Sequence, residues 1–153
     1  MTDKGTSFTI TLRNDIYPVV FVVQGGGGNF DDFVRTMVAE GGIEKKIRKQ
    51  VGNMDECQNT SGFRVDQGIV QGIFVKEPLS WNTLDTYAHE CYHAVYSGLE
   101  YLGLEGEEAG AYFMDYLIRF ISKQHLSTPK QDERGDRDCC LLCKVAVAIL
   151  MTL

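Results

Sequence analysis

His89, Glu90 and His93 form the most specific chemical pattern in the chain, a His-Glu-x-x-His motif. Residues four apart on a helix lie one turn above each other, so both imidazoles can reach one Zn²⁺ ion at about 2.0–2.1 Å. The glutamate between them is suited to take a proton from a water on the metal. The motif predicts that His89 and His93 are zinc ligands and that Glu90 is the general base. The alternative is a solvated helix face that carries these three residues without a metal.

A catalytic zinc site needs a third protein ligand and an open position for water. The remaining histidine, His125, lies at the far end of the next predicted helix, so a carboxylate is the expected third ligand. Glu105, Glu107 and Glu108 lie near the start of that helix and are the candidates. On a helical wheel Glu107 aligns with apolar residues expected to face the first helix, whereas Glu108 shares a polar sector.

The motif lies within the segment of the chain that most clearly predicts a helix, residues 83–102. Apolar residues recur there at helical spacing, and the two histidines fall roughly opposite them. These apolar residues are Leu84, Ala88, Cys91, Val95, Leu99 and Leu102. Gly103 and Gly106 interrupt the pattern, and residues 107–124 predict a second apolar helix that packs antiparallel to the first across a short loop.

The N-terminal half predicts the strands and shorter helices that support this pair. Residues 8–13 and 19–23 predict a β-hairpin, and residues 30–38 a helix with Asn29 as its N-cap. The four glycines at 25–28 lack the Gly-Lys-Ser/Thr ending of a P-loop and are interpreted as a plain loop. Residues 43–51 predict a short basic helix, and residues 52–66 predict a polar, turn-rich stretch. Residues 68–75 predict a strand. This strand either offers its edge to an extended peptide or is already paired within the sheet.

Composition limits the classes of protein to consider. The chain has 153 residues and a net charge of −6, which indicates one globular domain and argues against nucleic acid as a partner. Five cysteines, three of them crowded near the end, favour reduced thiols over a secreted disulfide framework. The first residues lack the pattern of a signal peptide, and no apolar run reaches the ~20 residues of a spanning helix. We therefore expect a cytoplasmic protein without a transmembrane segment.

The stretch from Tyr87 to Val95, followed by Glu108-Ala109-Gly110-Ala111-Tyr112, has the order His-Glu-x-x-His, short gap, Glu-x-x-Ala-Tyr. In this order the chain resembles, over residues 8–124, small zincin (gluzincin-like) zinc metallopeptidases encoded by tailed bacteriophages and prophages. The resemblance implies an α+β fold in which a short, mainly N-terminal sheet packs on the motif helix and an antiparallel second helix. It also implies Zn²⁺ held by His89, His93 and Glu108, Glu90 as the base, and a peptide or protein substrate in the host cytoplasm. From the residues alone, Glu107 stays open as the third ligand.

The predicted domain spans residues 8–126. A charged linker at 127–138 leads to an apolar tail at 139–153 that contains Cys139, Cys140 and Cys143. The tail's interpretations include a buried or oligomer-forming helix, a second zinc site and a palmitoylated segment, and the oligomeric state is left open. The functional alternative to a peptidase is a non-catalytic, zinc-stabilised protein that binds a host or virion protein.

Overall fold

The structure is a computed structural model that describes residues 7–14, 16–52, 61–80 and 82–125. The linker and the cysteine-containing tail predicted at 127–153 lie outside these ranges. Within them the elements follow the order β1 (Phe8–Arg13), β2 (Val20–Gly25), α1 (Phe30–Ala39), α2 (Glu44–Gly52), β3 (Gly62–Gln67), β4 (Val70–Val75), α3 (Leu84–Tyr101) and α4 (Glu107–His125). All four predicted helices are present, with ends within one residue of those expected.

The four strands form one mixed sheet in the order β1-β2-β4-β3. β1 and β2 pair antiparallel, which confirms the predicted hairpin, and β4 pairs parallel with β2 and antiparallel with β3. β4 therefore lies inside the sheet, and the hypothesis that this strand offers a free edge is wrong. The edge strands are β1 and β3, and all of β3 except its last residue falls in the stretch expected to be polar and turn-rich.

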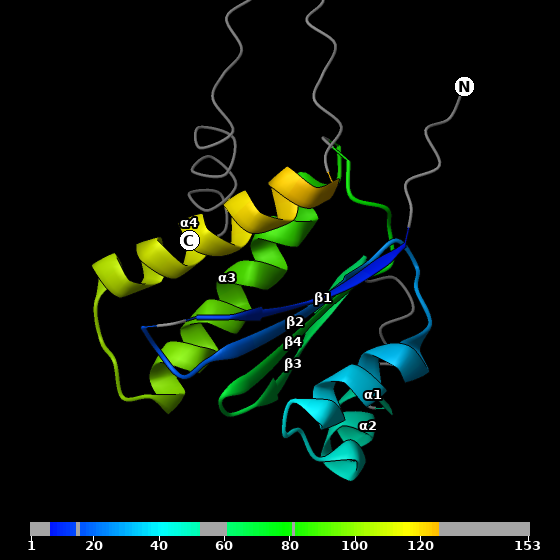
Figure 1. The fold of residues 1–153 in the computed structure, drawn as a ribbon, viewed down its shortest axis with the longest axis horizontal. Coiled ribbons are helices and arrows are strands. Elements are labelled where there is room, and N and C mark those ends of the chain that lie inside the picture. The colour runs from blue at the N-terminus through cyan, green and yellow to red at the C-terminus, as the bar shows by residue number, and fades with distance from the viewer. Residues whose placement is uncertain (1–6, 15, 53–60, 81, 126–153) are drawn as a thin grey trace, which may run out of the picture.

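Helices cover both faces of the sheet (Figure 1). Along β2, Phe21 and Val23 pack with α3 and α4, whereas Val22 points to the opposite face and packs with α1 and α2. This alternation follows from the two-residue period of a strand, and it explains why β2 is apolar on both sides. The arrangement confirms the predicted α+β class. α4 runs back over α3 in the opposite direction, as predicted for this helix pair.

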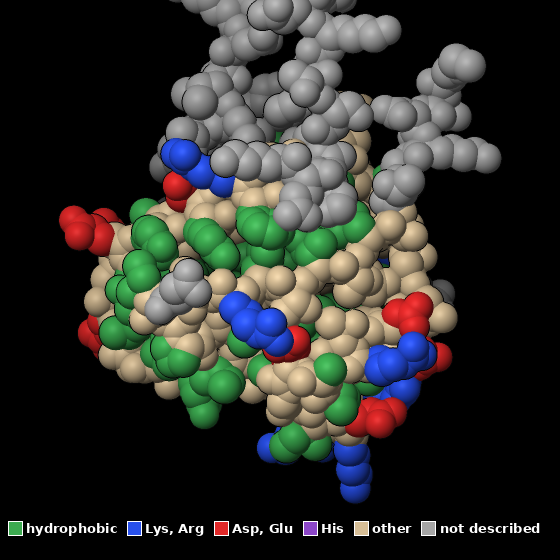
Figure 2. Space-filling view, viewed as in Figure 1, with side chains coloured by type: hydrophobic (Ala, Val, Ile, Leu, Met, Phe, Trp, Pro, Cys, Tyr) green, Lys and Arg blue, Asp and Glu red, His purple; other side chains and the backbone are tan. Residues whose placement is uncertain are grey.

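The outer surface of α1 and α2 is solvated and charged. Figure 2 shows Lys and Arg side chains beside Asp and Glu over these two helices. Arg48 bridges them, since it pairs with Glu44 on its own helix and with Asp31 on α1. The Asn29 side chain accepts a hydrogen bond from the Asp31 backbone at 2.8 Å, which confirms the predicted N-cap.

The glycine loop after β2 makes room for α3. A Cβ at Gly25 would lie 2.1 Å from the Tyr87 hydroxyl, and that hydroxyl donates to the Glu77 carbonyl at 2.8 Å. Gly26 and Gly27 have φ of 77° and 66°, which side chains disfavour. These glycines thus allow the first turns of α3 to be fastened to the end of the sheet. No helix in the described ranges is both long enough and apolar enough to cross a membrane.

Candidate metal centre

The two histidines of the motif lie on the solvent side of α3, as the helical wheel predicted. His89 and His93 are exposed, while the opposite side of the helix, including Cys91 and Val95, is buried between the sheet and α4. Because the buried side contacts the sheet and α4, the helix cannot rotate about its axis without exposing its apolar residues. The packing of α3 therefore fixes the direction in which both imidazoles point.

The two imidazoles converge on one point in space. The Nε2 atoms of His89 and His93 are 3.1 Å apart, and the rings lie nearly perpendicular, with centroids 4.6 Å apart and an 82° angle between planes. Two nitrogens bound tetrahedrally at about 2.0–2.1 Å would lie about 3.3 Å from each other. The two Nε2 atoms are within hydrogen-bond distance of each other in the structure, and this separation is also close to the spacing that one Zn²⁺ ion would require. Two imidazoles are donors that suit this metal.

Glu90 occupies a different position, at the contact between α3 and the edge strand. Its side chain is half-buried, and its Cγ would lie 3.1 Å from a Cβ at Gly62, the first residue of β3. Burial raises the pKa of the Glu90 carboxyl, and the positive charges of His89 and Arg64 act in the opposite direction. A half-buried carboxylate with a raised pKa beside two imidazoles is suited to accept and return a proton.

The pKa of His93 is shifted in the direction that favours metal binding. Burial makes the largest contribution to lowering this pKa, and the nearby charges of His89 and Arg64 lower it further. A metal binds the neutral imidazole, so a lowered pKa keeps the ring in its binding form to lower pH.

Arg64 is the residue at this centre that the sequence did not reveal. Phe63 and Val65 point into the core with α1 and α2, so Arg64 on β3 points to the opposite face, toward α3. There its Nη1 donates to the Ser97 hydroxyl. Ser97 lies four residues after His93 on the same helical row. The alternation of apolar and polar residues in 62–67 is the one sequence signal that could have indicated this strand.

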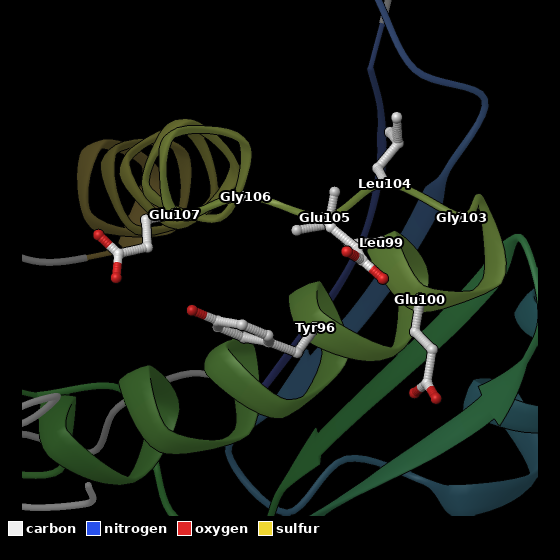
Figure 3. Close-up of a pocket in the computed structure, with 8 residues that line it drawn as sticks. All are labelled: Tyr96, Leu99, Glu100, Gly103, Leu104, Glu105, Gly106 and Glu107. Atoms are coloured by element: carbon white, nitrogen blue, oxygen red, sulfur yellow. The ribbon is translucent and has the colours of Figure 1, made fainter.

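The third-ligand candidates on α4 are both exposed, and they lie differently. Glu107 lines a hollow of about 460 Å³ between α3, the connecting loop and α4, whereas Glu108 is not part of its lining. Figure 3 shows Tyr96 extending from α3 toward the first turn of α4, with Glu107 pointing back to the α3 side. Within the described ranges, no three side chains of His, Cys, Asp or Glu are grouped closely enough to hold one ion. The structure thus brings the two predicted ligands, His89 and His93, together with Glu90 next to His89, but it does not bring Glu108 to them.

Searches of protein-family models, curated proteins and solved structures found nothing that matches this chain.

Proposed function

We propose that this protein is a zinc-dependent metallopeptidase that hydrolyses peptide bonds of a peptide or protein substrate. The observation that carries the proposal is the 3.1 Å separation of the His89 and His93 Nε2 atoms, with Glu90 half-buried beside them. A pair of imidazoles can hold a structural ion equally well. It is the neighbouring base, on the same helix and against the edge strand, that favours hydrolysis.

Each residue has a defined task in this proposal. When bound, Zn²⁺ supplies Lewis acidity, which polarises a scissile carbonyl and lowers the pKa of water toward about 7. Glu90 accepts a proton from the attacking water at its carboxylate and returns it to the leaving amine nitrogen. His89 and His93 remain neutral and hold the metal.

The third ligand comes from the first turn of α4. We assign it to Glu108, as the resemblance implies, and keep Glu107 as the alternative because it points back to the α3 side, although the hollow that it lines includes neither histidine. Gly103 and Gly106 in the preceding loop have φ of 65° and 147°, and a Cβ at either would meet nothing within 4 Å. In this proposal the first turn of α4 would have to move toward His93 when zinc binds, and glycine at both positions gives the loop backbone freedom that favours such a movement.

The test is inhibition of peptide cleavage by a small hydroxamate. Zinc-loaded full-length protein is incubated with a proteome-derived peptide library, with and without the hydroxamate. A catalytic zinc has an exchangeable position and binds the inhibitor, whereas a structural zinc is closed. Cleavage that the hydroxamate stops supports the proposal. A stoichiometric zinc that neither binds hydroxamate nor supports cleavage would instead identify a zinc-stabilised binding module.

A further inference from the structure

Arg64 differs from the other arginines in the described ranges because its ion pair with a carboxylate is longer than theirs. The other four each lie within 3.1 Å of a carboxylate oxygen; they are Arg13, Arg35, Arg48 and Arg119. Arg64 lies 3.8 Å from Asp66 Oδ2, which is beyond hydrogen-bond distance. The Asp66 carboxylate is also engaged elsewhere, since its Oδ1 accepts at 2.9 Å from the Gly68 backbone and from the Gln71 amide.

The guanidinium is nevertheless held in place and accessible. Its Nη1 donates to the Ser97 hydroxyl, and 38% of the side chain is exposed. A guanidinium has five N–H donors arranged as a fork that fits a carboxylate with two parallel hydrogen bonds. Arg64 therefore combines a held position with N–H donors that, among the residues the structure describes, are left for an anionic group from outside.

The position of Arg64 relates it to the metal centre. His89, His93 and Ser97 follow one row on α3 at four-residue intervals, so the Ser97 hydroxyl lies roughly 6 Å along the helix from His93. An extended peptide advances about 3.3–3.6 Å per residue. A group bound by Arg64 would thus lie one or two residues from a peptide bond held at the histidine pair.

We propose that Arg64 binds a carboxylate of the substrate, one or two residues from the bond that is cut. This inference rests on the proposed function, and it specifies the substrate as a peptide with an anionic group near the cleavage site. The carboxylate comes either from the C-terminus of the peptide or from an Asp or Glu side chain. Ser97 is a positioning residue, because it holds the guanidinium without contacting the substrate.

The experiment measures peptide binding to zinc-free full-length protein by calorimetry. Without zinc, the peptide stays intact and the metal cannot bind the carboxylate. Three short N-acetylated alanine-based probes are compared: one with a free C-terminus, one amidated with a single glutamate, and one amidated with glutamine in its place. The variants are Arg64→Met, Arg64→Lys and, as a control that also removes one charge, Arg35→Met. Arg35 lies on α1, on the other side of the sheet, with 76% of its side chain exposed.

We expect the parent to bind at least one carboxylate probe about 10- to 100-fold more tightly than the amidated glutamine probe. That ratio falls to about one in Arg64→Met, is partly retained in Arg64→Lys, and is unchanged in Arg35→Met. Preference for the free C-terminus or for the glutamate identifies the source of the carboxylate. Equal binding of all three probes by the parent, or the same ratio in parent and Arg64→Met, overturns the inference. If the zinc-loaded parent cleaves no peptide even without hydroxamate, but the carboxylate ratio is intact, the result counts against the peptidase and not against Arg64.

Discussion

Glu90 lies directly against Gly62: a Cβ at Gly62 would come within 3.1 Å of the Glu90 Cγ and of the Phe74 carbonyl oxygen. The first residue of the edge strand thus sets how closely the proposed base can approach the sheet. Any side chain at this position must displace the glutamate, because a backbone carbonyl on β4 cannot easily give way.

Gly62→Ala tests this contact. The added methyl pushes Glu90 by a few tenths of an ångström, so we expect kcat for peptide cleavage to fall roughly tenfold while bound zinc stays at the parent level. Zinc content and cleavage are measured on the same preparation. Gly52→Ala is the matched control, since a Cβ there meets nothing within 4 Å. Parent-like kcat in Gly62→Ala would show that the contact does not position the base.

Gly25→Ala tests how α3 is fastened to the sheet. The new Cβ would meet the Tyr87 hydroxyl at 2.1 Å and the Phe8 ring at 2.6 Å. We expect a loss of about 1–3 kcal/mol in the free energy of unfolding, measured by urea denaturation. Gly52→Ala again serves as the control and should change stability little. If the two alanine variants are equally stable, the close approach of Tyr87 is not a constraint on the fold.

The pKa of His93 can be read from an NMR titration of the zinc-free protein. Burial and the charges of His89 and Arg64 lower it, so His93 should titrate below the ordinary value of about 6.5. Arg64→Met should raise it, because removing a nearby positive charge makes the protonated ring less unfavourable. Zinc should consequently be released at a higher pH from this variant than from the parent. A His93 pKa above 6.5, or one that Arg64→Met leaves unchanged, contradicts this account of the site.

Single alanine variants identify the third ligand. Mutating a residue that only supports a metal ligand typically weakens metal binding roughly 10- to 100-fold. Glu108→Ala should weaken zinc binding by more than this, because it removes one of three protein ligands. Zinc affinity is measured by competition with a chelator, and the control is Asp32→Ala, which removes an exposed carboxylate on α1, on the other side of the sheet. Full zinc retention in Glu108→Ala together with loss in Glu107→Ala would assign the ligand to Glu107 instead.

Helices and the positions along them could be predicted from the sequence because their determinants are local. The apolar spacing around Cys91 and Val95 sets both the extent of α3 and the face that carries His89 and His93. Asn29 likewise marks the start of α1, because the hydrogen bond that caps the helix joins residues only two apart, Asn29 and Asp31.

The edge strand could not be predicted with the same certainty. In β3 only Phe63 and Val65 carry the alternating apolar signal, and they follow a long polar stretch. Arg64 on this strand donates a hydrogen bond to Ser97, which lies 33 residues further along the chain, and no local sequence pattern encodes such a contact. The order of the strands, which places β3 at an edge of the sheet and β4 inside it, depends on pairing across the whole sheet. For this reason the sequence did not indicate that Arg64 lies beside the candidate metal centre.

The most direct test of the central claim, that a zinc held by His89 and His93 acts with Glu90 in hydrolysis, is Glu90→Gln assayed for zinc content and peptide cleavage together. The amide keeps the size of the side chain and leaves both imidazoles in place, but it cannot accept the proton. We predict one zinc per chain in parent and variant, with kcat reduced about 10²–10⁴-fold in the variant. Equal cleavage by the two proteins at equal zinc content would contradict the account.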